Sequence, residues 1–238
     1  MQVTGTAELG SYPAGPQRHT IRPARTPTHS PCNLYDDHVQ EEPPVKPQNQ
    51  ELSHDQHRFL DSLSEVIRVQ GPQSATVTEV VRVARASRRT FYASFDNLED
   101  CFLQLLRRES TRTLGAVQKA IDPRARWQEQ VDRALTAWGD AVSVSPEIRP
   151  SPLKGDAGRR LQKDILKDYV QLLVSMSRNT GMVCGGVSPL EEHEAIMLMG
   201  GIRELYWYAL EQDVPMETVI RSARRFVNAA LSPGERGS

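Results

Sequence analysis

The chain has 238 residues, which is enough for one small and one larger domain. Its 29 lysines and arginines are balanced by 30 acidic residues, and the formal net charge is -1. This balance excludes a protein that binds nucleic acid through a basic surface all round, so a DNA-binding function would need positive charge concentrated in one segment.

Residues 1–50 differ in composition from the rest of the chain. They contain half of its 16 prolines and show no helical or strand periodicity. Because such a segment buries too little apolar surface to offset its ordering entropy, we expect a disordered, proline-rich N-terminal tail. The segment contains a weakly basic patch, which consists of Arg18, His19, Arg22 and Arg25. One interpretation is an arm that touches DNA. We favour the other interpretation, in which the segment is an unstructured extension or its start codon was assigned too early.

From about Ser53 the pattern becomes helical. Apolar residues recur at the spacing of one helix face, and Gly71–Pro72 ends this first predicted helix; the apolar positions are Phe59, Leu60, Leu63, Val66 and Ile67. Thr76 is a suitable N-cap for a second, short helix. Glu79, three residues later, completes a predicted capping box.

A tight turn at residues 84–86 separates the second helix from a third. Ser87 caps the third helix, which we expect to run to about Phe95. Phe91 and Phe95 are four residues apart and share one face, so they can anchor the helix while cations and hydroxyl groups occupy the other face. Residues 76–95 hold a single acidic residue against four arginines, Arg82, Arg85, Arg88 and Arg89.

This arrangement is typical of a helix-turn-helix that lays its second helix in the major groove of DNA. Arginine can bind a guanine edge in a bidentate manner, hydroxyl groups can bind bases or phosphates, and a helix N-terminus favours a phosphate. The alternative is an ordinary solvated cationic face. The predicted DNA-binding residues are Thr76, Thr78, Arg85, Ser87, Arg88, Arg89, Thr90, Tyr92 and Ser94.

The remainder of the chain continues the helical pattern. It contains no alternating strand pattern and no glycine-rich phosphate loop, so the sequence predicts an all-α fold. An N-terminal domain of three helices is expected at 51–97 and a larger helical domain at 98–238. The helices expected in the second domain lie at about 98–117, 131–142, 161–181, 190–211 and 216–231.

The run from Phe59 to Leu106 resembles the DNA-binding domain of the tetracycline-repressor (TetR) family of bacterial transcriptional regulators. The resemblance implies a homodimer that binds a palindromic operator. It also implies a C-terminal half that joins the subunits and encloses a pocket for a small effector. The shared elements, in chain order, are Gly71, Thr76–Val81, the turn Ala84–Ser87, Thr90–Phe95 and the acidic pair Glu99–Asp100.

Two residues depart from the family pattern. Arg85 stands where the turn usually has glycine, so it either adopts a strained positive φ or forms an ordinary right-handed turn and adds a phosphate contact. Leu98 replaces the usual lysine at the start of the fourth helix. The phosphate contact of that lysine is lost unless Arg85, Arg107 or Arg108 replaces it.

The predicted helix 190–211 is apolar on nearly every side, so it must be covered on more than one side. Gly200–Gly201 in its middle destabilises the helix by about 2 kcal/mol relative to alanine. This cost is explained if another helix packs closely at the two glycines. We favour a dimer partner over a neighbour in the same chain. The predicted dimer interface comprises Ile196, Gly200, Gly201, Arg203, Ile220, Ala223, Phe226 and Val227.

Aromatic and methionine side chains in the C-terminal half suit a small apolar or aromatic effector. Each of them, taken alone, is more simply a residue of the core. The predicted ligand-binding residues are Trp138, Tyr169, Leu172, Met176, Tyr206 and Trp207.

We therefore expect a ligand-responsive transcriptional regulator, in the first place a repressor, which its effector releases from double-stranded operator DNA. The alternative is a constitutive DNA-binding dimer without an effector. An enzyme, a cofactor or a metal site is not expected, because no nucleophile with a base, carboxylate pair or metal-ligand spacing is found. Since no run approaches the roughly 20 apolar residues of a membrane span and no signal-peptide core is found, the expected compartment is the cytoplasm.

Overall fold

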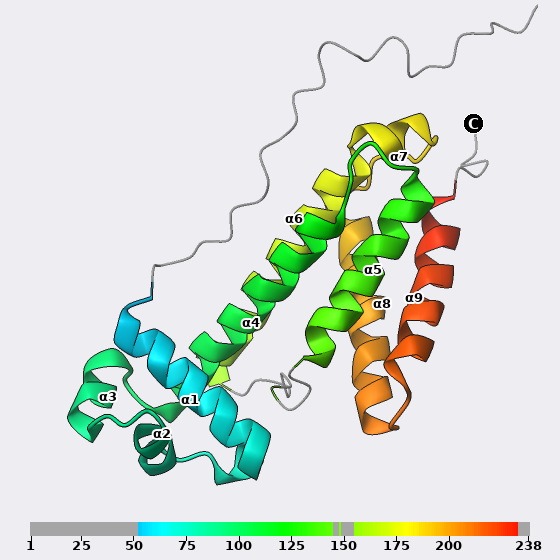
Figure 1. Cartoon of the computed structure of the whole chain (residues 1–238). Coiled ribbons are helices and arrows are strands. Elements are labelled where there is room, and N and C mark those ends of the chain that lie inside the picture. The colour runs from blue at the N-terminus through cyan, green and yellow to red at the C-terminus, as the bar shows by residue number, and fades with distance from the viewer. Residues whose placement is uncertain (1–51, 145–147, 149–154, 233–238) are drawn as a thin grey trace, which may run out of the picture.

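The computed structural model of the chain describes residues 52–144, 148 and 155–232 (Figure 1). The regular elements in these ranges are all helices, so the predicted all-α fold is confirmed there. The predicted tail and its basic patch lie outside the described residues. The elements are α1 (His54–Gln70), the 3-10 turn η2 (Pro72–Ser74), α2 (Val77–Val83), α3 (Arg88–Ser94), α4 (Leu98–Ala120), α5 (Trp127–Ser143), α6 (Gly155–Ser177), α7 (Thr180–Cys184), α8 (Glu192–Glu211) and α9 (Met216–Leu231).

Apolar side chains are buried in two hydrophobic clusters. The N-terminal cluster lies between α1, α2, α3 and the first half of α4, and in it the Phe59 ring centroid is 5.3 Å from that of Phe91 and 6.3 Å from that of Phe95. The C-terminal cluster lies between the second half of α4 and α5 to α9. Figure 1 shows α1, α2 and α3 at one end of a long helical bundle. None of the described helices is both long and apolar enough to cross a membrane.

One helix, α4, belongs to both clusters. Leu105 and Leu106 in its first half are buried with α1 to α3, whereas Leu114 and Val117 further along are buried with the larger bundle. The expected domain boundary at residue 98 therefore falls at the start of a helix whose first turns pack on the N-terminal side. A displacement of α4 must disturb the packing of both clusters.

Side-chain caps determine where the helices of the N-terminal unit begin. Ser87 and Asn97 cap α3 and α4 by accepting a backbone N–H from the first turn. Thr76 caps α2 in the same way, with Oγ1 3.2 Å from the Glu79 nitrogen. The predicted reciprocal half of that capping box is replaced by an ion pair, because the Glu79 carboxylate accepts two hydrogen bonds from the Arg82 guanidinium.

The end of α6 differs from the prediction of one helix that continues to about Gly181. α6 ends at Ser177, and the short helix α7 begins after Asn179. The side-chain amides of Asn179 and the fully buried Gln130 of α5 bind each other in both directions, at 2.7 and 3.2 Å. Gln130 Nε2 also donates to the Ala125 carbonyl at 2.8 Å. This network fastens α7 to the loop between α4 and α5.

Gly181 lies against this network and has no room for a side chain, since a Cβ there would overlap the Ala125 carbonyl oxygen and Gln130 Nε2. We expect Gly181→Ala to lower the free energy of unfolding by about 1–3 kcal/mol. Gly115→Ala on α4 is the matched control: nothing lies within 4 Å of its added methyl group, and the better helix propensity should raise stability by about 1 kcal/mol. Urea denaturation followed by circular dichroism measures both. Equal midpoints for the two variants would contradict this packing.

Candidate DNA-binding face and internal cavity

The turn between α2 and α3 contains a residue in the left-handed region. Arg85 has a φ of 50°, so of the two conformations considered for it the strained one is present. The Ala86 N–H donates to the Val81 carbonyl at 3.0 Å and closes the turn. A residue with a Cβ in this region costs on the order of 1 kcal/mol. In return, the turn carries an exposed cation where glycine would leave none.

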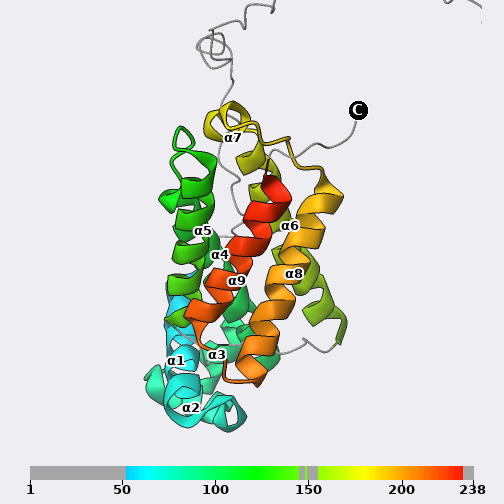
Figure 2. The same ribbon diagram turned by 90° about the vertical axis from the view of Figure 1, so that its right-hand side faces the viewer.

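α3 is held against the N-terminal cluster by its two phenylalanines. Phe91 is fully buried and Phe95 is 2% exposed, and both belong to the cluster that contains Val80 and Val81 of α2. Two buried positions four residues apart fix which face of a helix points inward. The opposite face of α3 is therefore turned to solvent, at the end of the molecule that lies away from α7 (Figure 2).

Three arginines give this outer face its positive charge. Arg85, Arg88 and Arg89 are exposed, and Arg88 Nη2 donates to Thr78 Oγ1 of α2 at 2.6 Å, which orients its guanidinium across the two helices. Arg82 differs, because it is 2.8 Å from the Glu79 carboxylate. Its hydrogen bond is the main reason why the pKa of Glu79 is lowered. The net positive charge of this face therefore comes from Arg85, Arg88 and Arg89.

The hydroxyl groups predicted to bind DNA differ in whether their own proton is available to a DNA oxygen. Thr76 Oγ1 accepts an N–H and keeps its own proton for donation. Ser94 Oγ donates to the Thr90 carbonyl at 3.0 Å, so its proton is not available to a phosphate oxygen, which counts against its predicted role. Ser87 Oγ lies 2.8 Å from Thr90 Oγ1, so one of these two hydroxyl groups donates to the other and only one of their two protons stays available to a ligand. Tyr92 is 57% exposed on the outer face.

Two arginines of α4 do not replace the missing lysine at position 98. Leu98 itself is half-buried against the N-terminal cluster. Arg107 Nη1 lies 3.1 Å from Asp168 of α6, and Arg108 Nη1 lies 2.7 Å from Asp61 of α1. Both guanidinium groups are therefore bound within the protein. Of the three arginines considered as replacements for the lysine, only Arg85 stays available to a phosphate.

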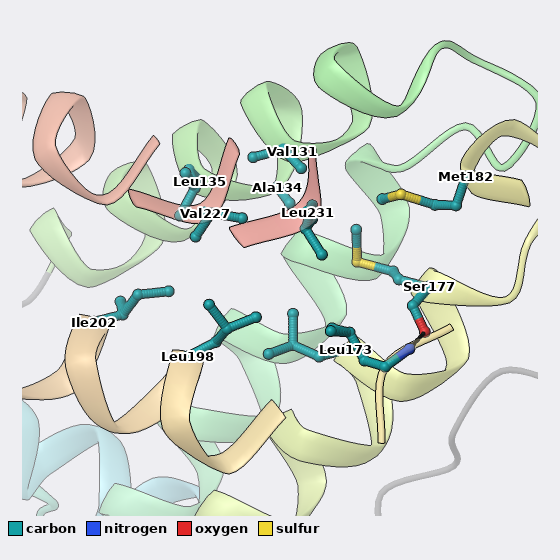
Figure 3. Close-up of a pocket in the computed structure, with 12 residues that line it drawn as sticks. Val131, Ala134, Leu135, Leu173, Ser177, Met182, Leu198, Ile202, Val227 and Leu231 are labelled. Carbon is teal, nitrogen blue, oxygen red and sulfur yellow. Dashed lines mark hydrogen bonds between the residues drawn. The ribbon is translucent and has the colours of Figure 1, made fainter. Parts of the chain in front are cut away.

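An internal cavity of about 50 Å³ lies within the larger bundle. Side chains from α5, α6, α8 and α9 face one another across it, and Met182 of α7 lies at one end (Figure 3). Ser177 is the one lining residue with a polar side chain. The lining residues are Val131, Ala134, Leu135, Leu173, Met176, Ser177, Met182, Leu190, Leu198, Ile202, Val227 and Leu231.

Most of the predicted ligand-binding residues lie elsewhere. Met176 lines the cavity, but three of the aromatic residues, Trp138, Tyr206 and Trp207, form a separate group between α5 and α8. The ring centroids of Trp138 and Tyr206 are 5.4 Å apart in an edge-to-face contact, and Tyr206 contacts Trp207 at 6.2 Å. Because these rings pack against one another, they are packing residues in this conformation.

Tyr169 and Leu172 are also packing residues. Burial raises the pKa of Tyr169 to about 12, against the opposing effect of hydrogen bonds with Ser110 and Thr113 of α4. Leu172 is buried in the C-terminal cluster. Most of the aliphatic residues around the cavity are not among the predicted ligand-binding residues, although the apolar stripe of α5 contains two of them, Val131 and Leu135.

Part of the predicted dimer interface is an exposed surface of α8 and α9. Ile196 and Phe226 are 42% and 54% exposed. Gly200 faces open space, and a Cβ on the exposed Gly201 would come within 3.6 Å of the Phe226 ring. Arg203 is exposed on the same helix. The two glycines therefore make a shallow, uncovered region of helix rather than a contact within the protomer.

The other predicted interface residues belong to the protomer itself. Ala223 and Val227 are 1% and 7% exposed in the C-terminal cluster, and Ile220 packs against that cluster. α9 packs on both α5 and α8, which turns this face inward and away from any second copy. Two further large residues of α8, outside the predicted set, are exposed: Met197 is 73% and Tyr208 57% exposed.

No family model matches the sequence, and no curated protein sequence matches it. The fold, however, is similar to solved structures. The fatty acid degradation regulator FadR from Bacillus halodurans has a TM-score of 0.61 at 15% identity, over 75% of this chain and 96% of that one. A putative TetR-family transcriptional regulator from Rhodococcus has 0.58 at 15%, over 75% and 98%. FadR from Bacillus subtilis in complex with stearoyl-CoA has 0.58 at 18%, over 75% and 98%.

These similarities identify the class of fold. The described helices have the TetR-like fold, as the resemblance of the N-terminal run implied. At this level of identity the fold alone is shared.

The strain in the turn between α2 and α3 can be tested directly. Arg85→Gly should raise the free energy of unfolding by about 0.5–1 kcal/mol, because glycine adopts a positive φ without the Cβ clash. Arg85→Ala removes the same charge but keeps the Cβ, so it should not raise stability. Thermal unfolding of both variants measures the difference. Equal melting temperatures would show that the left-handed conformation carries no strain.

Proposed function

We propose that the protein is a cytoplasmic transcriptional regulator, in the first place a repressor, which binds a palindromic operator as a homodimer. In this proposal residues 51–97 form the DNA-binding domain and residues 98–238 the effector-binding and dimerisation domain. The observation that carries the proposal is the cationic face of α3, which Phe91 and Phe95 hold against the core so that Arg88 and Arg89 project outward. No catalytic role is proposed.

The two outermost arginines have different tasks in this proposal. Arg89 is exposed at the start of α3 and can bind a guanine edge. Arg88 is held by Thr78, so it approaches the same groove from a fixed direction, with less side-chain entropy left to lose on binding. The N-terminus of α2, with the Thr76 hydroxyl, suits a phosphate, as does Arg85 in the turn.

The exposed surface of α8 and α9 is the proposed dimer interface. Met197, Tyr208 and Phe226 are each more than half exposed, and the glycine pair of α8 lets a second helix approach closely. Joining two copies through this surface would present two α3 helices to one operator. A two-fold operator requires those helices to reach major grooves about 34 Å apart.

α4 is the proposed connection between effector and DNA. Arg107 ties it to α6 and Arg108 ties it to α1, so a shift of α6 reaches the DNA-binding unit through one rigid helix. Burial raises the pKa of Asp168, the partner of Arg107, by more than the nearby guanidinium lowers it. A coupling of about 1–3 kcal/mol suffices for a 5- to 150-fold change in operator affinity.

One observation favours the alternative, a constitutive DNA-binding dimer. The cavity of about 50 Å³ is far smaller than the roughly 300–1,000 Å³ of ligand pockets. The effector proposal therefore requires a bound state in which the bundle has opened. Stabilisation by a ligand distinguishes the two functions, since a constitutive regulator has no such ligand.

The recognition face is tested by selecting binding sites from randomised duplexes. Arg88→Ala and Arg89→Ala should each relax sequence preference at one base pair of a half-site, by about 1–3 kcal/mol. Tyr92→Phe should weaken binding to all sequences about evenly, because a lost phosphate contact carries no sequence information.

Arg178→Ala is the matched control for that selection. It removes the same charge from an exposed position between α6 and α7, at the far end of the molecule. It should leave both affinity and preference unchanged. Selected sites identical to those of the parent for both α3 variants would overturn the assignment of base reading.

The dimer interface is tested by Met197→Glu. A carboxylate at this exposed position of α8 would be buried without a partner in the dimer, so it should shift the protein to monomers in analytical ultracentrifugation. Val69→Glu, at a 61% exposed position of α1, is the control and should remain dimeric. A dimer of unchanged stability for Met197→Glu would place the interface elsewhere.

A further inference from the structure

The cavity between α5, α6, α8 and α9 has a uniform chemical character. Apart from Ser177, its lining consists of Ala, Val, Leu, Ile and Met side chains, and no aromatic or charged side chain contributes to it. Figure 3 shows these aliphatic groups pointing toward one another from opposite helices. A ligand here would meet only flexible hydrocarbon and thioether surface.

The single polar lining group is already satisfied. Ser177 Oγ donates to the Val174 carbonyl at 2.8 Å and accepts from the Leu190 N–H at 2.8 Å. Ser177 is only 2% exposed, so breaking either bond would leave a buried polar atom without a partner. A charged or hydrogen-bonding group placed in the cavity would be desolvated without compensation, which costs several kcal/mol. The buried part of a ligand must therefore be hydrocarbon.

The volume of the cavity favours a linear hydrocarbon chain over an aromatic ring. An aliphatic cavity that holds a benzene ring measures about 150 Å³, three times the volume of about 50 Å³ found here. A flat ring would have to push opposite helices apart across its full width. A polymethylene chain is narrower and can extend as single side chains change rotamer.

Two of the residues that line the cavity are especially able to change rotamer. Met176 and Met182 line it from α6 and α7, and methionine has three rotatable bonds and a soft thioether that adapts to irregular shapes. Leu190, in the segment before α8, lines the cavity as well. Movement of these two unbranched side chains would lengthen the cavity along one direction, as the first part of the opening of the bundle that a bound ligand requires.

We infer that the cavity receives the unbranched hydrocarbon chain of an amphipathic ligand, whose polar head stays outside the bundle. This inference rests on the proposed effector-responsive function and narrows it from apolar or aromatic ligands to aliphatic chains. The head is not selected by the cavity, so a carboxylate and an alcohol of equal chain length bind alike.

Thermal unfolding of the full chain tests this with dodecanoate below its critical micelle concentration, with dodecanol below its solubility limit, and with naphthalene as the ring. At about 100 times Kd, each chain ligand should raise the melting temperature by roughly 5 to 10 °C. Naphthalene should leave it unchanged. No shift with either chain ligand, or an equal shift with naphthalene, overturns the inference.

Two variants locate the site. Ala134→Leu adds three carbons to the cavity wall and should abolish the shift, whereas Ala157→Leu adds the same atoms at an exposed position of α6 and should retain it. Leu173→Ala enlarges the cavity and should admit naphthalene, which then raises the melting temperature. Circular dichroism confirms that each variant is folded. A shift that survives in Ala134→Leu overturns the location.

A separate mobility-shift measurement of operator binding distinguishes the proposal of effector control from the inference about the cavity. Chain ligands that stabilise the protein but leave operator affinity unchanged would refute effector control while supporting the inference about the cavity. Release of operator by naphthalene, with no effect of the chain ligands, would support effector control and overturn the inference.

Discussion

The packing of α4 in two hydrophobic clusters is the constraint on which the arrangement of this protein depends. The first half of the helix completes the core around Phe59, and its second half forms a wall of the larger bundle. Neither cluster is closed without it. Because interiors are close-packed and resist compression, a helix shared in this way transmits displacement rather than absorbing it. The ion pairs of Arg107 and Arg108 reinforce the same helix at the point where the two clusters meet.

The N-terminal unit could be predicted in detail because its signals are local. A capping residue, a turn and two phenylalanines four apart each act within a few residues of chain, so Thr76, Ser87, Phe91 and Phe95 have the expected positions. The conformation of Arg85 was left open for a physical reason. Both turn geometries are accessible to the sequence, and the choice between them depends on how α3 docks on α1.

The cavity and the free surface of the larger bundle could not be predicted in the same way. A periodic apolar stripe says that a face is buried but does not say which helix buries it. Ala223 and Phe226 are three residues apart on α9, yet one is in the core and the other is exposed. Likewise, Trp138 closes a packing contact with Tyr206 instead of lining the cavity, because the relative rotation of α5 and α8 decides where each ring points. Such rotations are set by contacts between segments far apart in sequence.

The order of the helices along the sequence has a consequence for synthesis, because α9 follows every helix that it packs against. α1 to α4 can bury most of the N-terminal cluster as soon as they leave the ribosome, because most of its contacts are short in sequence, and Ile148 and Leu161 join it later. The larger bundle must wait for α9, which packs between α5 and α8 and supplies Val219, Ala223 and Val227 to its interior. Until α9 has been synthesised, the nascent chain therefore carries a folded N-terminal unit attached to a bundle whose apolar interior is open, and the packing of α9 removes that apolar surface from contact with other chains.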